Sequence, residues 1–193
     1  MPAPDVRTAT PAEIDQCVAT IVLAFSSDPA ARWAFVEPHV YFEIFPHFVR
    51  AFGGKAFDHG SAHQIAGCAA ALWIPPGIEP DEEAMVALIE SAVAESDREA
   101  MSGVFEQMAA FRPAEPHWYL PLIGTDPAKQ GNGYGSALLR HALAICDRQK
   151  LAAYLEATSA RNVPLYQRHG FAALGTIQVG TSPPITPMLR KPR

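Results

Sequence analysis

The sequence is poor in cysteine, and it contains neither a cluster of basic residues nor a long apolar run. Each shortage excludes a class of protein. The three cysteines, Cys17, Cys68 and Cys146, are widely separated and lack CxxC spacing. They fit free thiols in a reducing compartment, mostly as buried small side chains, and the histidines add no Cys/His pattern typical of a zinc site. We therefore expect neither disulfides nor a metal.

Charge and hydropathy limit the partners in the same way. The net charge is -5, and binding to a phosphate backbone requires several cations on one face, so the sequence argues against nucleic acid. No apolar segment approaches the ~20 residues needed to span a bilayer, and Met1–Asp5 has no cationic start followed by an apolar run. We expect a cytoplasmic protein that binds no membrane and is a monomer or a homodimer.

What the sequence does contain is typical of one globular domain. Hydrophobic residues make up 49% of the 193 positions and charged residues 18%. Strand and helix signals alternate, with hairpins near both ends, which favours a mixed α/β sheet over a purely parallel one. The expected strands lie at 6–9, 62–66, 68–74, 117–125, 152–158, 171–179 and 187–190. The expected helices lie at 10–25, along the aromatic stretch 33–52, at 81–111 with a weak point at 102–103, at 133–150 and at 163–169.

A glycine cluster stands between an apolar strand and the helix that follows it. Gly131, Gly133 and Gly135 alternate with other residues at this junction. Glycine permits positive φ and a close approach to a ligand, while the first helical turn offers free N–H groups and the positive end of a dipole. The pattern predicts a phosphate site, with Lys129 as a nearby cation and Gln130 as an amide donor. The glycines could also serve a tight turn alone.

Other phosphate motifs match less well. A P-loop is absent, because Ser136 follows Gly135 directly and no lysine stands between them. The run 131–136 lacks the third glycine of a dinucleotide fingerprint, although Glu156 stands about where a ribose-binding acid would be expected. The chain after Glu156 is too short for the rest of a doubly wound sheet, which argues against that fold.

Two ordered segments resemble the GNAT acetyltransferase superfamily. The run Ile123–Gly135 resembles its Q/R-x-x-G-x-G/A coenzyme A signature, and Tyr154–Phe171 is similar to its strand, loop, short helix with a tyrosine and terminal Gly-Phe. Within the superfamily, Phe111–Pro116, Leu155–Asn162 and Leu189–Pro192 look most like puromycin N-acetyltransferase-like members. The similarity covers roughly residues 110–193 and is loose before that.

The resemblance implies an α/β fold in which helices flank a mixed, mostly antiparallel sheet, with a splayed strand pair at the CoA site. It implies one domain over 1–193, in which 1–110 shape the acceptor pocket and 111–193 bind acetyl-CoA as cosubstrate. Main-chain groups of 123–125 would bind the pantetheine amides and the oxyanion, and Asn162 the pantetheine arm. The cofactor-binding residues expected from the resemblance are Ile123, Gly124, Thr125, Gln130, Gly131, Asn132, Gly133, Tyr134, Gly135, Ser136 and Asn162.

Acetyl transfer to an amine needs a base and a group that receives the departing sulfur. Glu156 is the one acid on the strand after the glycine-turn helix, and the resemblance maps it onto a proposed general base. An edge carboxylate in solvent or in a salt bridge is the plainer alternative. Tyr166 lies on a short helix that Asn162 is expected to cap, and in the GNAT pattern this tyrosine is the general acid. Its plainer alternative is a half-buried aromatic side chain.

The first half of the chain carries no motif for the acceptor. Its aromatic side chains could line a pocket for an apolar or aromatic amine, although most of them belong in a core. We select Trp33, Phe35 and Tyr119 as candidate substrate contacts, and Asp28 as a partner for an ammonium or, alternatively, a turn former.

Three functions remain open at this point. The first is transfer of an acetyl group from acetyl-CoA to a primary amine, preferably of a small molecule, by a direct mechanism. The second is a catalytically silent CoA-binding regulatory module. The third is a dinucleotide-dependent oxidoreductase.

Overall fold

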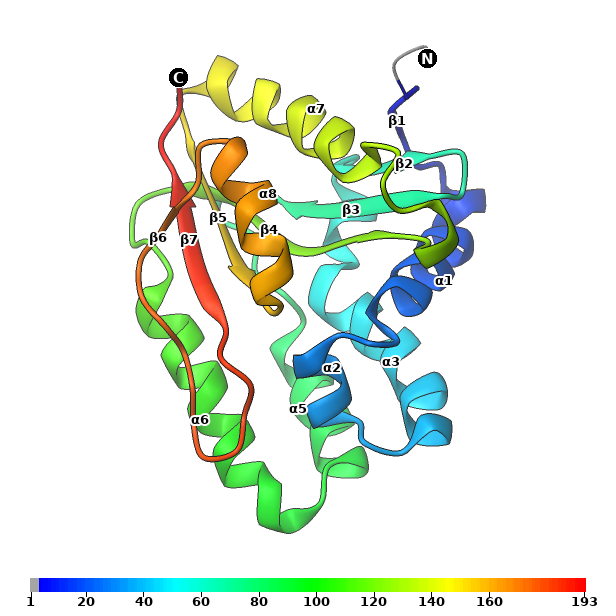
Figure 1. The fold of residues 1–193 in the computed structure, drawn as a ribbon, viewed down its shortest axis with the longest axis vertical. Coiled ribbons are helices and arrows are strands. Elements are labelled where there is room, and N and C mark those ends of the chain that lie inside the picture. Colours follow the sequence, from blue (N-terminus) through cyan, green and yellow to red (C-terminus); the bar gives the residue numbers. More distant parts are fainter. Residues whose placement is uncertain (1–3) are drawn as a thin grey trace.

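The computed structural model describes residues 4–193, and its centre is a seven-stranded sheet with the order β1-β2-β3-β4-β5-β7-β6 (Figure 1). Neighbouring strands are antiparallel except β4 and β5, which are parallel. The mixed, mostly antiparallel sheet expected from the sequence is therefore confirmed. The strands are β1 (Arg7–Thr8), β2 (Ala62–Ile65), β3 (Ala69–Ile74), β4 (His117–Thr125), β5 (Ala152–Ala157), β6 (Ala172–Ala173) and β7 (Thr186–Arg190).

Helices cover both faces of this sheet. The α-helices are α1 (Ile14–Phe25), α2 (Pro29–Ala34), α3 (Pro38–Gly53), α4 (Lys55–Asp58), α5 (Glu82–Ala92), α6 (Glu95–Phe111), α7 (Tyr134–Gln149) and α8 (Val163–Arg168). Short 3-10 helices are η1 (Pro11–Glu13), η2 (Pro127–Lys129) and η3 (Ala160–Asn162). Figure 1 shows α7 along one face of β3 and β4, whereas α1, α3 and α5 lie on the other side.

Strand β3 explains why the sheet is covered twice. All six of its residues are buried, and successive side chains of a strand point to opposite faces. Leu72 and Ile74 belong to the core beneath α1 and α3, whereas Trp73 belongs to the core beneath α7. A strand that is apolar on both faces requires a layer on each side.

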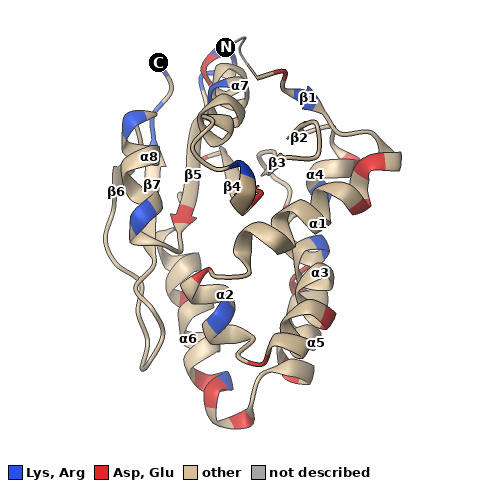
Figure 2. Ribbon diagram, turned by 45° about the vertical axis from the view of Figure 1, so that its right-hand side comes forward, with Lys and Arg blue, Asp and Glu red and all other residues tan. Residues whose placement is uncertain are grey.

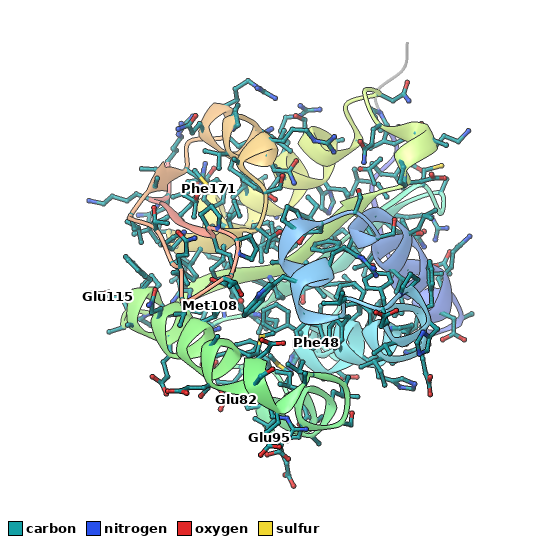
Figure 3. All side chains as sticks on the ribbon, turned by 60° about the horizontal axis from the view of Figure 1, so that its bottom comes forward. Phe48, Glu82, Glu95, Met108, Glu115 and Phe171 are labelled. Carbon is teal, nitrogen blue, oxygen red and sulfur yellow. The ribbon has the colours of Figure 1, made fainter. Side chains whose placement is uncertain are left out.

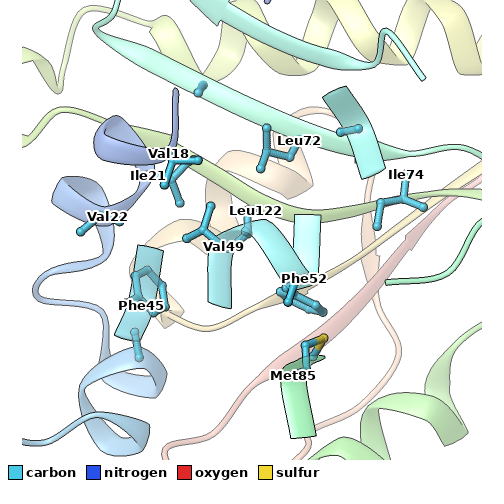
Figure 4. Packing of buried hydrophobic residues seen from close by; sticks show 14 of the residues in the cluster. Val18, Ile21, Val22, Phe45, Val49, Phe52, Leu72, Ile74, Met85 and Leu122 are labelled. Carbon is cyan, nitrogen blue, oxygen red and sulfur yellow. The ribbon is translucent and has the colours of Figure 1, made fainter. Parts of the chain in front are cut away.

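The larger core is built from helix faces with regular spacing. Phe45, Val49 and Phe52 recur every three or four residues of α3, which places them on one face of that helix. This face packs against β3 and β4 through Leu72 and Leu122, as Figure 4 shows. The aromatic stretch of the first half therefore serves mainly as core, as its composition suggested.

The parallel strands β4 and β5 separate after a short paired stretch. They pair from His117 to Tyr119 opposite 152–154, while β4 continues to Thr125 along β3. On the β3 side the register shifts between Leu72 and Ile74, where β4 carries an extra residue near Pro121. Proline has no N–H for the ladder and is tolerated at such bulges. The separation of β4 and β5 after Tyr119 is the splayed pair that we expected, and the bulge lies in the same part of β4.

Two details differ from the sequence-based expectation. The helical segment 81–111 breaks at Val93 and Ala94, and residues 102–103 lie inside α6. Glycine at position 103 allows close packing, since a Cβ there would lie only 3.3 Å from the Val179 side chain. The closing strand expected at 171–179 is reduced to β6 and one isolated bridge between Ile177 and Ile185. Prolines at 183, 184 and 187 remove ladder donors from its partner segment.

Candidate active site

A cavity of about 430 Å³ occupies the opening between the splayed strands. Its walls come from the second half of β4, the end of β5, the turn before α7, and α8. Most of the predicted site residues line it together. These are Asp28, Ile123, Gly124, Thr125, Gln130, Gly131, Gly133, Tyr134, Gly135, Ser136, Glu156, Asn162 and Tyr166. The fold thus gathers both sequence signatures around one space.

The glycine turn has the backbone that an anion site needs. Gly131 and Gly133 have φ values of 82° and 76°, in the left-handed region that favours glycine. Gly133 is the N-cap of α7, whereas Gly135 already lies inside the helix. The first turn of a 16-residue helix therefore faces the cavity with its unpaired N–H groups and positive dipole end.

Basic side chains beside this turn come from two parts of the chain. Lys129 precedes the glycines, while Arg161 and Arg168 reach the same cavity from η3 and α8. Arg161 donates a hydrogen bond to Gln130 over 3.3 Å, which ties η3 to the turn. The sequence analysis named Lys129 but missed both arginines. Both arginines lie within the segment 154–171 that resembles the family, and that position could have identified them.

Glu156 of β5 lines the cavity. Alternation along β5 places it on the same sheet face as Tyr154, toward α1 and α3, whereas Leu155 faces α7. Its Oε1 atom is buried and has no hydrogen-bond partner among the described residues. Burial raises the pKa of Glu156 to about 7. Glu156 is therefore neither the solvated nor the salt-bridged edge carboxylate considered above.

Tyr119 lies behind Glu156 and does not line the cavities described here. It is buried. Its phenol lowers the pKa of Glu156 and so partly offsets the effect of burial, as do the Arg112 guanidinium and the Tyr154 phenol. Arg112 stacks over the Tyr119 ring at 4.4 Å and pairs with Glu79 at 2.7 Å. Tyr119 therefore influences the Glu156 carboxyl group and does not line the cavities as a ligand contact would.

Tyr166 points from α8 into the same cavity and is 6% exposed. Burial, followed by the negative charge of Asp28, raises the pKa of its phenol. The group therefore stays protonated at neutral pH and can donate a hydrogen bond. The expected cap of its helix is different in detail, because the Asn162 side chain makes no capping hydrogen bond and η3 leads directly into α8.

Asp28 is an N-cap as well as a cavity residue. Its Oδ1 atom accepts from the N–H groups of Ala30 and Ala31 at 3.0 and 3.1 Å, and its Oδ2 atom accepts from Thr158 at 2.6 Å. Burial raises the pKa of Asp28, against the opposing effect of these hydrogen bonds. Its role as a turn former is confirmed, and Thr158, which the sequence analysis did not select, fixes α2 to the end of β5.

A second, narrower cavity of about 100 Å³ adjoins the first. Trp33 and Phe35 line it, as do Phe48 of α3 and Met108 of α6, which are labelled in Figure 3. The residues common to both cavities are Phe25, Asp28, Pro121, Glu156 and Thr158. The buried carboxyl group therefore stands where a polar cavity meets an aromatic one.

Some predicted residues lie elsewhere. The Asn132 side chain turns back to donate to the Lys129 carbonyl at 2.8 Å and does not line the cavity.

His59 and His63 are four residues apart, but His59 ends α4 and His63 lies in β2, so no helix face presents both rings. Within residues 4–193, no group of three or more potential ligands is arranged to hold a metal ion. No helix in that range is long and apolar enough to cross a membrane.

Comparisons with known proteins identify the family and agree with the fold described above. A family model described as the acetyltransferase (GNAT) family matches residues 18–171. A Schizosaccharomyces pombe protein named as an uncharacterized N-acetyltransferase is 33% identical over 78 residues, which are 39% of this chain and 32% of that protein. The matched segment thus spans about a third of that relative's length.

Solved structures are similar over nearly the whole chain. A Corynebacterium glutamicum protein described as a histone acetyltransferase HPA2 and related acetyltransferase has a TM-score of 0.70 and 28% identity, covering 100% of this chain and 98% of that one. Arylalkylamine N-acetyltransferase 2 from Aedes aegypti has a TM-score of 0.69 and 13% identity, covering 98% and 99% of the two chains. At that lower identity the similarity concerns the fold.

Proposed function

Because the chain belongs to the GNAT family of acetyltransferases, we propose that it transfers the acetyl group of acetyl-CoA directly to a primary amine of a small molecule. The observation that carries this proposal is the position of Glu156, a buried carboxyl group at the junction of two cavities. One cavity has the glycine turn and basic side chains that suit a nucleotide pyrophosphate. The other has the apolar walls that suit the body of an amine.

The larger cavity offers complementary groups along the length of a CoA molecule. We assign the pyrophosphate to the N–H groups of the turn 131–135, with Lys129 and Arg161 as counter-charges. Beyond Tyr119, β4 pairs with no described residue on its β5 side. Main-chain groups of Ile123 and Thr125 on this free edge can pair with the pantetheine amides as an added strand would. We place Asn162 beside the same arm.

Glu156 would prepare the nucleophile. An alkylammonium has a pKa near ~10, so its nitrogen needs a base to attack at neutral pH. Glu156 takes one proton from the ammonium, directly or through one water, and passes it to solvent. The neutral amine nitrogen then attacks the thioester carbonyl and a C–N bond forms. The surplus proton that remains on nitrogen passes to Glu156 as the tetrahedral intermediate collapses to the amide. The pKa of about 7 lets the carboxylate accept this proton and release it to solvent.

Tyr166 would stabilise the departing sulfur by a hydrogen bond. When the C–S bond breaks, the electron pair stays on sulfur as a thiolate, whose ordinary pKa of about 8.5 lies below that of a phenol. The raised pKa of Tyr166 keeps its proton on oxygen. Tyr166 therefore stabilises the thiolate by a hydrogen bond, and solvent supplies the proton that completes the thiol.

The two other candidate functions fare differently against the structure. The hypothesis of a dinucleotide-dependent oxidoreductase is wrong. A doubly wound fold needs several parallel strand pairs, and β4 and β5 are the one parallel pair in the described sheet. A silent CoA-binding module does not need a buried base facing an aromatic cavity. The finer kinship with puromycin N-acetyltransferase-like members, through Phe111–Pro116 and 155–162, is part of our proposal, as is a cytoplasmic location that suits the buried thiols of Cys17 and Cys146.

Thiol release from acetyl-CoA in the presence of a panel of primary amines tests the proposal. We expect turnover with at least one amine. In Tyr166→Phe, kcat falls about 10- to 100-fold, since a hydrogen bond to a charged group contributes about 1.5–3 kcal/mol. Acetyl-CoA affinity stays unchanged, because the lost contact is made to the departing thiolate. Tyr41→Phe is the matched control, since it removes another buried phenol, which donates to Val22 O at 2.6 Å and lines neither cavity. An unchanged kcat in Tyr166→Phe would exclude the assigned role.

Gly133→Ala tests the anion site. At a φ of 76° an added Cβ strains the backbone by roughly 1–2 kcal/mol, and relief of that strain turns the N–H groups away from the pyrophosphate. We expect the Kd for CoA, measured by calorimetry, to rise about 5- to 30-fold. Gly77→Ala is the control, because Gly77 has a φ of 80° and equally open surroundings, but does not line the cavity. Equal losses of affinity in both variants would contradict this role.

A further inference from the structure

The aromatic cavity has polar side chains at one end. Asp28, Glu156 and Thr158 are its polar lining residues, and all three are shared with the larger cavity. The opposite end is shared instead with a third cavity of about 490 Å³ between α5 and α6. The residues common to those two cavities are Phe52, Ile89, Met101, Phe105 and Met108. An acceptor in the aromatic cavity thus meets carboxyl groups at its reacting end and apolar groups at its other end.

The reacting end can hold one ammonium group. Both carboxylate oxygens of Asp28 already accept hydrogen bonds, from the start of α2 and from Thr158. The Oε1 atom of Glu156 has no partner among the described residues. One buried and unsatisfied carboxylate oxygen matches one cationic nitrogen, which would also satisfy that oxygen.

A second cationic nitrogen would find no such partner inside the aromatic cavity. Its walls beyond the reacting end are phenylalanine rings and the side chains of Trp33, Ile89, Val104 and two methionines. The attraction of a cation to an aromatic face is weaker than the loss of hydration of a buried ammonium. Acidic residues do occur nearby on α5 and α6, as Figure 2 shows, but Glu82, Glu90 and Glu106 line the outer α5–α6 cavity.

From this distribution of charge we propose that the acceptor is a hydrophobic primary monoamine, with one cationic nitrogen and an uncharged aromatic or aliphatic body. The inference rests on the proposed function and deepens it by naming the substrate class. Diamines and polyamines of similar length are excluded by their second charge. The body of the substrate occupies the space between α2, α3 and α6, and its nitrogen lies at Glu156.

Pentylamine and 1,5-diaminopentane provide a matched pair, because they differ by one amino group at the far end of the same chain. We expect kcat/KM for pentylamine at pH 8 to exceed that for the diamine by about 100-fold or more. The aromatic monoamine 2-phenylethylamine should be a substrate as well. Rates within threefold of one another for pentylamine and the diamine would overturn the substrate class and leave the proposed function intact. Absence of thiol release with every amine would overturn the proposed function itself.

A carboxylate introduced at the far end should reverse the discrimination. Ile89 is half-buried and lines both the aromatic and the α5–α6 cavities. In Ile89→Glu, we expect kcat/KM for the diamine to rise at least tenfold relative to pentylamine. Val86→Glu is the control, since Val86 is 54% exposed on the same helix and lines the outer cavity alone. If Ile89→Glu does not fold, the ratio measured for the unmodified protein still decides. An unchanged ratio in folded Ile89→Glu would contradict this assignment of the far end.

Discussion

Replacing Glu156 by glutamine lowers kcat/KM for the amine about a hundredfold to ten-thousandfold, which is the usual contribution of a positioned general base. The amide keeps the size of the side chain and removes its ability to accept a proton. The affinity for acetyl-CoA stays within about twofold, because the turn 131–135 is unchanged. Initial-rate measurements of thiol release, together with calorimetric titration of CoA, separate the two quantities. A variant that retains full kcat/KM would remove Glu156 from the mechanism.

The pH profile provides a second test of the same residue. Burial raises the pKa of Glu156 to about 7, and the ionised carboxylate is the active form. We expect kcat/KM to rise through an apparent pKa near 7 in the unmodified protein, ahead of the titration of the free amine near ~10. Glu156→Gln lacks the lower limb and keeps the upper one. The same limb in both proteins would assign it to another group.

Stability separates loss of chemistry from loss of folding in this variant. The pKa of Glu156 is raised from its ordinary 4.5 to about 7 by folding, so the folded chain holds a proton that the unfolded chain releases. Unfolding is therefore favoured progressively as the pH rises from about 4.5 to 7, and the destabilisation is complete above that range. Glu156→Gln cannot ionise, and at pH 8 it should be at least as resistant to urea as the unmodified protein.

Asp147→Ala lowers the free energy of unfolding by about 3 kcal/mol, since it leaves a buried guanidinium without its partner. Arg190 of β7 has a side chain that is 5% exposed, and its Nη1 and Nη2 atoms donate to Asp147 of α7 over 2.8 Å each. Its Nε atom donates to the His169 carbonyl at 3.0 Å. The pair thereby ties α7 to the last strand and to the end of α8. Urea unfolding monitored by circular dichroism measures the change.

A surface pair is the control for this prediction. Asp15 also accepts from an arginine, Arg50, but its side chain is 91% exposed. Asp15→Ala should therefore change the free energy of unfolding by less than about 1 kcal/mol. Similar losses in the two variants would show that burial does not govern the contribution of the Asp147 pair.

The pH dependence of the Asp147 pair has the opposite sign to that of Glu156. Hydrogen bonding to Arg190 lowers the pKa of Asp147 in the folded chain. Its stabilisation is present above the ordinary aspartate pKa of about 3.9 and is lost as the pH falls below it toward the lowered folded value. The difference in stability between the unmodified protein and Asp147→Ala should therefore shrink in acid.

Local patterns predicted the parts of the site that depend on backbone conformation. The glycine turn required positive φ at a strand-to-helix junction, and Gly131 and Gly133 have it. The bounds of β4 agree with the predicted strand 117–125. The predicted break of the helical segment 81–111 at residues 102–103 was misplaced. Gly103 lies inside a helix and is required by close packing against Val179, which is 76 positions further along the chain. Nothing in the local sequence records such a contact.

The sequence by itself determined the class of fold and the two signatures, since strand alternation, helix spacing and glycine turns are properties of neighbouring residues. It also indicated Glu156 and Tyr166 through the resemblance. The tertiary structure alone decided their environments. Burial raises the pKa of Glu156, and Tyr119, Arg112 and Tyr154 partly offset that rise. Arg161 and Arg168 reach the cavity through the placement of η3 and α8. The aromatic cavity is likewise assembled from α2, α3, α5 and α6. Segments far apart in the sequence decide these environments, because desolvation and charge depend on distances through space and not along the chain.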